Sequence, residues 1–412
     1  MLGARCFNCS ILLALTLMIT IFQIANCQNG NNSNLPSFAR VNGCHFVMNG
    51  KRLYLNGFNA YWMMFLAADP STRVKVTSTF QQASKYCMNI ARIWAFSDGG
   101  ATPLQSSPGS YNEDMFKGLD FVISEAKKYG VYLILSLVNN FEDYGGRPQY
   151  VQWARERGQS LKNDDFYTNL VVKQYYKNHV KAVLTRKNSF TGVMYKDDTT
   201  IFSWELMNEA RCGSDPSGKK LQQWITEMSA YVKSIDNLHL LEIGLEGFYG
   251  ESVKSRKQYN PNNVTVGTDF IANNQIPQID FTTVHMYPEH WLKPNSTDGA
   301  QQAFVDRWIQ AHTEDCNSVL KKPLIITEFG KSDRLPGYSI EKRNNYLGHV
   351  YNAIFISAKA GGSFLGGIFW QLMTQGMENY ADGYQVILEE SPTTAKVIAE
   401  QSRKLHSLSP MK

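Results

Sequence analysis

The chain has 412 residues, with 41 Lys and Arg against 36 Asp and Glu, so its formal net charge is +5. Hydrophobic residues make up 43% and charged residues 19%, which excludes a disordered chain, a coiled coil, a collagen-like fibre and a small disulfide-stabilised fold. The weak positive charge contains no run of five Lys or Arg, so we expect no nucleic-acid partner. Aromatic residues reach 12%, and their rings are suited to stacking on flat apolar ligand faces.

Residues 1–27 have the features of a secretory signal peptide. Arg5 precedes an apolar run from Ile11 to Ala25, and a small-x-small cleavage pattern ends at Cys27. The run covers about 15 residues, which is short for a membrane span of about 20. We therefore expect cleavage and a secreted, extracellular protein without membrane contact in its mature form. An uncleaved signal anchor is the alternative.

Beyond residue 27 the sequence contains four cysteines without a CxxC pair, which argues against a zinc ribbon or a redox motif. They are Cys44, Cys87, Cys212 and Cys316. Disulfides and buried free thiols both remain open for them. We expect a monomer, with a disulfide-linked dimer as the alternative. Three N-x-S/T sequons would become glycosylation sites on a secretory route; they begin at Asn31, Asn263 and Asn295.

Residues 28–37 are polar and are expected to form a disordered tether. After them, short runs rich in Ile, Val and aromatic residues alternate with longer amphipathic stretches, which is typical of buried parallel strands separated by helices. The amphipathic stretches include residues 116–129, 221–235 and 346–360. The predicted strands are residues 53–60, 89–96, 131–138, 200–207, 240–244, 280–287, 323–329 and 367–372.

Eight strand–helix units predict the α/β class and a single (β/α)8 barrel with loop insertions. An open doubly wound sheet is the alternative, but no G-x-G-x-x-G follows the first strand and the chain has no Walker loop. The glycines at 361–362 and 366–367 are expected in the turn before the eighth strand. No linker or internal repeat divides the chain, so we predict one barrel domain over residues 38–412.

In such a barrel, functional side chains lie at the carboxyl ends of the strands. The fourth predicted strand ends in W-E-L-M-N-E-A, which contains Glu205 and Glu209, and the seventh ends in I-T-E-F-G, which contains Glu328. A carboxylate inside a central strand is costly to desolvate unless it is paired. A structural ion pair with Arg92 would explain Glu328 but not the two further glutamates, so we expect a functional site.

Two carboxyl groups at one barrel mouth are the groups that glycoside hydrolysis requires, one to protonate the leaving oxygen and one to attack the anomeric carbon. We expect Glu328 to be the nucleophile, with Tyr287 donating to it and Arg92 keeping its pKa low. We expect Glu209 to be the acid/base, or proton donor, because nearby apolar groups would raise its pKa. A retaining mechanism needs the two groups about 5–5.5 Å apart.

The neighbours of these glutamates suggest how a sugar would bind. Asn208 is expected to hold the 2-hydroxyl group, an interaction that strengthens in the transition state. Trp94 and Trp370 offer rings for the apolar face of the sugar, with core packing as the alternative for each. Glu205 lies deeper in its strand and is expected to be structural.

Other chemistries have less support. Neither H-E-x-x-H nor G-x-S-x-G occurs, and His285 and His290 do not have the spacing of a helical metal-binding pair. We interpret these two histidines as hydrogen-bonded within the protein or as substrate-binding. No metal and no organic cofactor is expected.

Several segments resemble glycoside hydrolase family 5 and, within it, the secreted plant endo-β-1,4-mannanases. The similarity covers nearly all of the chain after residue 38, and W-E-x-x-N-E followed by a distant I-T-E-F-G is its most specific part. The segments are FVMNGKRLYLNGFNAYW (46–62), ARIWAFSDGG (91–100), FSWELMNEARC (202–212), TVHMYPEHW (283–291), PLIITEFGKS (323–332) and IFWQL (368–372). The resemblance implies Glu209 as acid/base and Glu328 as nucleophile. It also implies that the site is completed by Arg92, His285, Tyr287 and Trp370, with Trp94 in a sugar subsite.

The leading hypothesis is a secreted, retaining endo-β-1,4-mannanase that cuts internal bonds in mannan, galactomannan and glucomannan of the plant cell wall. The two glutamates by themselves support a β-glycosidase, whereas β-mannan as the substrate follows from the resemblance. Members of the family also transfer the glycosyl group to other sugars, so transglycosylation is a further expectation. A cellulase-like β-1,4-glucanase and a non-catalytic polysaccharide-binding protein are the alternatives.

Overall fold

The structure is a computed structural model that describes residues 37–409, in which the chain from Phe38 onward forms one compact unit. The predicted signal peptide, and the predicted tether apart from Ser37, lie outside the described residues. The strands are β1 (Arg40–Asn42), β2 (His45–Met48), β3 (Lys51–Leu53), β4 (Leu55–Asn59), β5 (Ile90–Trp94), β6 (Gln105–Ser107), β7 (Ser110–Tyr111), β8 (Tyr132–Ser136), β9 (Ile201–Glu205), β10 (Leu240–Glu242), β11 (Thr282–Met286), β12 (Leu324–Phe329), β13 (Phe364–Phe369), β14 (Leu372–Met373) and β15 (Val386–Ile387). The α-helices are α2 (Met63–Ala68), α3 (Arg73–Lys85), α4 (Glu113–Tyr129), α5 (Gly146–Arg155), α6 (Leu170–Leu184), α7 (Lys219–Ile235), α8 (Phe270–Asn274), α9 (Pro288–Trp291), α10 (Asp298–Asp315), α11 (Ile340–Lys359) and α12 (Pro392–His406).

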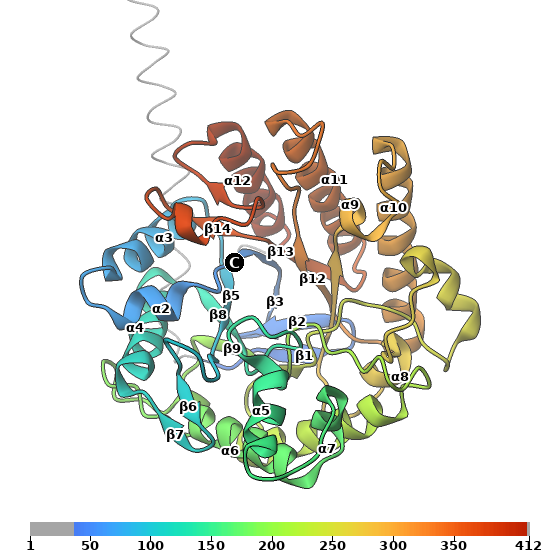
Figure 1. Cartoon of the computed structure of the whole chain (residues 1–412). Helices are drawn as coiled ribbons and strands as arrows, with labels where there is room; N and C mark the ends of the chain where they lie inside the picture. Colours follow the sequence, from blue (N-terminus) through green and yellow to red (C-terminus); the bar gives the residue numbers. More distant parts are fainter. Residues whose placement is uncertain (1–36, 410–412) are drawn as a thin grey trace, which may run out of the picture. The chain divides into compact units, whose positions relative to one another are not determined.

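Eight parallel strands form one sheet in the order β10-β9-β8-β5-β4-β13-β12-β11, which is chain order around a ring. The two end strands are joined across the remaining gap, where Asp280 N donates to Leu241 O over 2.8 Å and His285 N donates to Glu246 O over 2.9 Å. Helices surround these strands on the outside (Figure 1). The predicted (β/α)8 barrel is confirmed.

Seven of the predicted strands contain the observed ones, but the prediction for the eighth was wrong at its start. The strand β13 begins at Phe364, and Gly366 and Gly367 lie inside it rather than in the preceding turn. A Cβ atom on Gly366 would lie 2.7 Å from both Cβ and the carbonyl oxygen of Leu55 on the neighbouring strand β4. Glycine is therefore needed here for close packing of two strands, and the sequence pattern alone resembles a turn.

The helix α4 illustrates why the predicted helices began later in the chain than the observed ones. Asn112 precedes the helix, and its side-chain oxygen accepts hydrogen bonds from the backbone N–H groups of Asp114 and Met115. Gly130 follows the helix with φ of 69°, a left-handed conformation that ends helices at low cost for glycine. The apolar pattern marks only the buried face, so it misses the polar first turn that this cap stabilises.

A small antiparallel sheet of β1, β2 and β3 covers the amino-terminal end of the barrel and was not predicted. Its Phe46 is fully buried and packs edge-on against Phe202 of β9 and Phe281, with ring centroids 5.2 and 5.3 Å apart. Burial of three aromatic rings closes this end of the barrel with apolar surface. The carboxyl ends of the strands are thereby left as the open end.

Three features of the described chain bear on compartment and assembly. Within residues 37–409, no helix combines the length and apolar character needed to cross a membrane. Cys44, Cys212 and Cys316 carry free thiols. Asn263 and Asn295, which begin two of the three predicted glycosylation sequons, are exposed, whereas Asn31 lies outside the described residues.

Candidate active site

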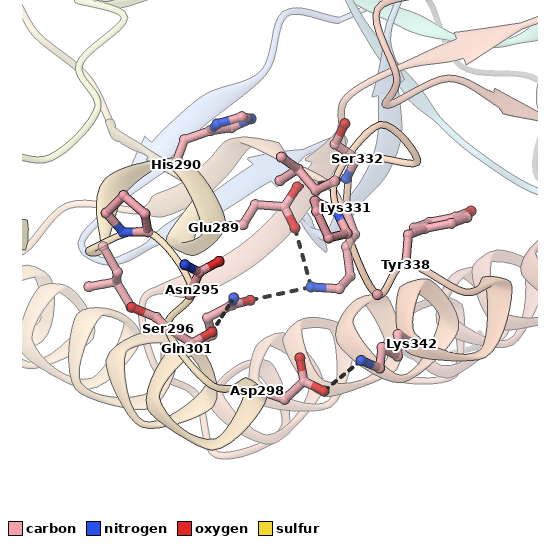
Figure 2. A pocket seen from close by; sticks show the side chains of 15 residues that line it. Glu289, His290, Asn295, Ser296, Asp298, Gln301, Lys331, Ser332, Tyr338 and Lys342 are labelled. Carbon is pink, nitrogen blue, oxygen red and sulfur yellow. Dashed lines mark hydrogen bonds and ion pairs between the residues drawn. The ribbon is translucent and has the colours of Figure 1, made fainter.

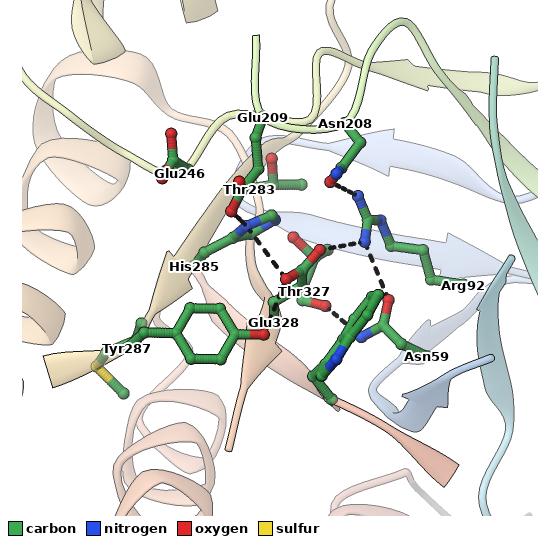
Figure 3. Close-up of polar contacts among 12 residues, drawn as sticks. Asn59, Arg92, Asn208, Glu209, Glu246, Thr283, His285, Tyr287, Thr327 and Glu328 are labelled. Atoms are coloured by element: carbon green, nitrogen blue, oxygen red, sulfur yellow. Dashed lines mark hydrogen bonds and ion pairs between the residues drawn. The ribbon is translucent and has the colours of Figure 1, made fainter. Parts of the chain in front are cut away.

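A cavity of about 470 Å³ opens at the carboxyl ends of the barrel strands. Among its lining residues are Trp94, Asn208, Glu209, Tyr287, Glu328 and Trp370, six of the eight residues predicted from the sequence. The two others, Arg92 and His285, lie behind this lining and are almost fully buried. Figure 3 shows that Arg92 contacts Glu328 and that His285 contacts Glu209.

Arg92, at the centre of β5, uses all five of its N–H donors. Its Nε and Nη2 form a fork with the carboxylate of Glu205 at 2.6 and 2.8 Å. Its Nη1 donates to Glu328 Oε1 at 2.6 Å and to Asn59 Oδ1 at 3.0 Å. The remaining Nη2 donor reaches Asn208 Oδ1 at 2.6 Å. Arginine offers five donors in one plane, so four side chains from β4, β12, β9 and the loop after β9 are held in a fixed arrangement.

Glu209 and Glu328 face each other across the cavity. One carboxylate oxygen of each, together with a ring nitrogen of His285, lie within 4.8 Å of one another. Inverting glycosidases hold their two carboxyl groups about 6.5–9.5 Å apart, whereas retaining enzymes hold them about 5–5.5 Å apart. The observed spacing therefore suits attack by one carboxylate while the other transfers a proton.

Glu209 lies in the loop after β9, and its backbone is fixed by both neighbouring strand ends. Asn208 N donates to Val138 O and Glu209 N donates to Gly244 O, each over 2.8 Å. Glu209 has φ of 53°, in the left-handed region that non-glycine residues seldom adopt. Gly244 permits this approach, since a Cβ atom there would lie 2.0 Å from the carbonyl oxygen of Met207. A conformation held in this way directs the carboxyl group toward the cavity.

Burial is the main influence on the protonation of both glutamates. It raises the pKa of Glu209, and Glu205 adds to this effect while Arg211 and Arg92 oppose it. Burial also raises the pKa of Glu328, against the lowering effects of His285, Arg92 and the hydrogen bond from Tyr287. The expectation that Arg92 keeps the pKa of Glu328 low was wrong in its net direction, because desolvation outweighs the ion pair.

Hydrogen bonds nevertheless distinguish the two glutamates. Glu328 accepts from Arg92 at Oε1 and from the Tyr287 hydroxyl at Oε2 over 2.9 Å, so both of its oxygens are occupied by donors. Donors of this kind favour the ionised carboxylate. Among residues 37–409, Glu209 has one side-chain hydrogen-bond partner, His285, whose Nδ1 lies 2.7 Å from its Oε1. Glu328 is therefore the better anion of the two, and Glu209 the better acid.

His285 links the two carboxyl groups. Its Nδ1 lies 2.7 Å from Glu209 and 3.6 Å from Oε2 of Glu328. Burial lowers the pKa of its imidazole, although the nearby carboxylate of Glu328 opposes this. The lowered pKa of His285 favours the neutral imidazole, which can orient Glu209 without adding a second cation beside Arg92.

Aromatic rings form one wall of the cavity. The rings of Trp370 and Tyr61 are nearly parallel, with centroids 5.8 Å apart and an interplanar angle of 7°. The indole nitrogen of Trp370 donates to Asp382, which fixes the orientation of its half-exposed ring. Trp94 is 94% buried and packs against Tyr61 and Phe96, so most of its surface serves the core while it also lines the cavity.

An ion pair that lines the cavity, between Arg211 and Glu246, was not predicted from the sequence. Arg211 forms two hydrogen bonds with Glu246, at 2.7 Å from Nε and 2.5 Å from Nη2, and both residues line the cavity beside Glu209. Burial and the charge of Glu209 raise the pKa of Glu246 to about 7, although Arg211 acts against this. Glu246 lies just beyond the predicted end of the fifth strand, and its position there was the available signal.

Glu242 was also missed, although it lies in β10 directly beside Glu205 of β9. Its Oε2 accepts from Gly244 N at 2.5 Å and from Thr283 Oγ1 at 3.2 Å, whereas its buried Oε1 has no donor within residues 37–409. Burial and the adjacent Glu205 raise the pKa of Glu242 well above its ordinary value. A neutral acid at Glu242 places its proton where it can reach Glu205.

Glu205, paired with Arg92, has a lowered pKa despite burial. Its predicted structural position is consistent with these contacts.

Glu209, His285 and Glu328 are also the group among the described residues whose ligand atoms are close enough to hold a metal ion. The guanidinium of Arg92 lies 2.6 Å from Glu328 and already supplies a positive charge there. A divalent cation would be repelled by this neighbour, so the arrangement suits two carboxyl groups that act by themselves.

Comparisons with known proteins agree with this geometry. A family model described as GH family 5 beta-mannosidase-like matches residues 36–385. Mannan endo-1,4-beta-mannosidase 4 of Solanum lycopersicum is 58% identical over 98% of this chain and 100% of its own length. Mannan endo-1,4-beta-mannosidase 1 of Arabidopsis thaliana is 59% identical over 90% of each chain.

Solved structures give the same result at lower identity. The endo-beta-1,4-mannanase from Thermotoga petrophila aligns with a TM-score of 0.74 and 30% identity, covering 87% of this chain and 78% of that one. The endo-1,4-beta-mannanase from Rhizomucor miehei aligns with a TM-score of 0.75 and 29% identity, covering 90% of this chain and 100% of that one.

Proposed function

This chain belongs to the β-mannosidase-like members of glycoside hydrolase family 5, and on that premise we propose that it is a retaining endo-β-1,4-mannanase. The observation that carries the proposal is the approach of Glu209 and Glu328 to within 4.8 Å of each other in one cavity. The relatives named for mannan hydrolysis indicate the polysaccharide. Its β-1,4-linked main chain would lie in the cavity with the bond to be cut between the two glutamates.

In the first step, a Glu328 carboxylate oxygen attacks the anomeric carbon and the bond to the leaving sugar breaks. Glu209 gives its proton to the departing glycosidic oxygen, so the leaving sugar is released as an alcohol and a glycosyl ester forms on Glu328. Burial raises the pKa of Glu209, which favours the protonated form that this step requires. The two hydrogen bonds to Glu328 hold its oxygens in position for the attack.

In the second step, the now ionised Glu209 takes a proton from a water molecule. The hydroxide part of that water attacks the anomeric carbon and displaces Glu328 as a carboxylate. Two displacements restore the original β configuration. A sugar hydroxyl can replace water as the acceptor in the same step, which gives transglycosylation.

The other cavity residues would act on the sugar or on the glutamates. Asn208, held between Arg92 and Asn139, presents its amide beside Glu209 for the 2-hydroxyl group. The half-exposed ring of Trp370 offers an apolar face for a pyranose. Arg92, His285 and Tyr287 are positioning residues for the two glutamates, because their contacts are to the carboxyl groups.

Purified protein incubated with galactomannan, glucomannan and carboxymethyl cellulose tests the function directly. Reducing ends should appear fastest from the two mannans, and a rapid fall in viscosity should accompany the first cuts, because internal bonds are broken. Faster release from carboxymethyl cellulose would make the protein a β-1,4-glucanase. Binding to mannan without any release would make it a polysaccharide-binding protein.

We also propose that the protein is secreted to the plant cell wall, where its polysaccharide substrate would be. The apolar segment Ile11–Ala25 and the sequons at Asn31, Asn263 and Asn295 support this location. Amino-terminal sequencing of protein recovered from the medium of secreting cells tests it. A start shortly after Cys27 is expected, whereas an intact first segment in the membrane fraction would mean a signal anchor.

A further inference from the structure

A second cavity of about 370 Å³ lies beside the active site, and none of the functions described above uses it. It is formed by α9, the start of α10 and the loop of residues 331–338 that follows β12 (Figure 2). Its volume falls within the range of about 300–1,000 Å³ found for small-ligand sites. This second cavity is therefore large enough for one sugar residue.

A built wall separates the second cavity from the active site. Glu289, on α9, accepts hydrogen bonds from Ser332 N at 2.7 Å, from the Tyr384 hydroxyl at 3.0 Å and from Lys331 Nζ at 3.2 Å. Tyr384 lines the catalytic cavity, whereas Lys331 and Ser332 line the second one. A linear chain that fills the active site does not pass through this wall, so a group attached to that chain would reach the second cavity over its rim.

His290 forms that rim, because it lines both cavities. Its side chain is exposed, and its ring nitrogens make no hydrogen bond within the described residues 37–409. Its ring lies near the ring of Tyr384, with the two centroids 5.9 Å apart. An exposed imidazole with both nitrogens available is suited to bind the hydroxyl groups of a ligand that crosses from one cavity to the other.

The charges in the second cavity are already paired. Lys331 contacts Glu289 at 3.2 Å, and Lys342 contacts Asp298 at 2.9 Å (Figure 2). An ion would therefore gain little there, whereas the ammonium groups retain N–H donors for neutral hydroxyl groups. Apolar side chains complete the lining: Leu292, Pro294, Leu335 and Pro336. Polar donors together with an apolar surface match a pyranose, which has hydroxyl edges and an apolar face.

We propose that the second cavity binds a hexose branch of a mannan whose main chain occupies the active site. The branch would leave the main chain at a sugar beside Tyr287 and Tyr384, pass over His290 and enter between Lys331 and Leu335. This inference rests on the proposed function, since it needs a β-mannan in the active site. It makes the branch a recognised part of the substrate rather than a group the enzyme merely tolerates.

The test compares two oligosaccharides with the same β-1,4-mannan main chain, one linear and one carrying a single α-1,6-galactosyl branch. Leu335→Trp fills the second cavity, and Leu335→Ala is the matched control that leaves it open. Leu335→Trp should lower kcat/KM on the branched substrate about tenfold and leave kcat/KM on the linear one within about twofold. Leu335→Ala removes part of the apolar lining without filling the cavity, so it should lower the ratio of branched to linear kcat/KM by less than Leu335→Trp does.

Lys342→Met is a second variant for the case in which Leu335→Trp does not fold. Lys342 is half-exposed and paired only at the surface, so its loss should leave the fold intact and lower kcat/KM on the branched substrate alone, about threefold. Equal changes of kcat/KM on both substrates, or no change on either, would contradict the proposal that the second cavity binds the branch. The same holds if the wild-type enzyme cuts only the linear substrate. Wild-type protein that cuts neither substrate would instead contradict the proposed function.

Discussion

Arg92 and Glu328 are joined by a buried hydrogen-bonded ion pair, in which Nη1 lies 2.6 Å from Oε1. The same guanidinium also forms hydrogen bonds with Glu205, Asn208 and Asn59. One cation therefore positions the candidate nucleophile, the residue next to the candidate acid and two side chains inside the barrel. A buried pair of this kind contributes arrangement more than stability, because desolvation offsets much of its attraction.

Removing this cation should lower both stability and turnover, because it leaves buried carboxylates without a partner. Arg92→Met leaves Glu205 and Glu328 without their partner, which should lower the free energy of unfolding by about 3–5 kcal/mol, as for other broken buried pairs. Arg92→Lys keeps the charge but loses the fork, so it should be more stable than Arg92→Met and still poorly active. Denaturant titrations and kcat on linear mannan check both variants. Full activity in Arg92→Lys would show that the fork is not needed.

Loss of either glutamate proposed as catalytic should remove turnover without loss of the fold. Glu328→Ala and Glu209→Ala each delete one buried carboxyl group whose pKa is raised by desolvation, so neither side chain is a strong source of stability. We expect kcat on mannan to fall by at least about 10³-fold in each, within the scale of lost covalent and acid–base catalysis. Circular dichroism melts serve as the fold control. An active Glu328→Ala protein would refute the nucleophile assignment.

Azide should distinguish the two roles by product configuration. In Glu209→Ala, a substrate with a good leaving group still forms the ester on Glu328, and azide then attacks it to give the β-mannosyl azide. In Glu328→Ala, azide takes the place of the missing carboxylate and attacks once, which gives the inverted α-mannosyl azide. Proton NMR of the products identifies each configuration. Identical products from both variants, or no rescue of Glu209→Ala, would contradict the assignments.

The pH profile should be bell-shaped and displaced upward from ordinary carboxyl values. Activity needs Glu328 ionised, so it falls as the pH drops through the Glu328 pKa, and it needs Glu209 protonated, so it falls as the pH rises through the Glu209 pKa. Burial raises the pKa of both groups. Measurements of kcat/KM on mannan oligosaccharides across pH check this shape.

Glu246 should control the alkaline side of that profile. Its pKa is about 7, so above that pH its negative charge disfavours ionisation of the adjacent Glu209. Glu246→Gln removes this charge and leaves Arg211 unpaired, and both changes lower the pKa of Glu209. The alkaline limb should move to lower pH in Glu246→Gln and stay near its wild-type position in Glu246→Asp. A shift to higher pH would contradict the coupling.

Substitution of Glu242 by glutamine should be tolerated, whereas substitution by leucine, which forms no side-chain hydrogen bonds, should not be. If Glu242 is a neutral acid that donates to Glu205, Glu242→Gln supplies an N–H donor in its place and should retain most of kcat. Glu242→Leu leaves Gly244 N without its acceptor and removes one of the two acceptors of the Thr283 hydroxyl, the other being Leu245 O, so it should be less stable and less active. Infrared spectra offer a direct check, since the band of a protonated carboxyl group near neutral pH should weaken in Glu242→Gln.

The fold could be predicted from sequence because each barrel element carries its own local pattern. A strand buried on both faces is apolar throughout, as in the run that became β12, and the helices between such strands show one apolar face. The pattern failed at β13, where Gly366 and Gly367 are required by packing against neighbouring side chains that are distant in sequence.

The identity of Glu209 and Glu328 as candidates also came from sequence, since a glutamate at the end of an apolar strand is unusual wherever the strand lies. Their separation, the five contacts of Arg92 and the net rise in the pKa of Glu328 depend on which strands are neighbours and how deeply the site is buried. No local pattern encodes these quantities. The Arg211–Glu246 pair and the second cavity beside Glu289 have the same origin, because they form between segments that only the closed barrel brings together. Sequence thus determined which residues are candidates for the chemistry. The tertiary structure decided their charges and contacts, because electrostatic and hydrogen-bond energies depend on distance in space and on the exclusion of water.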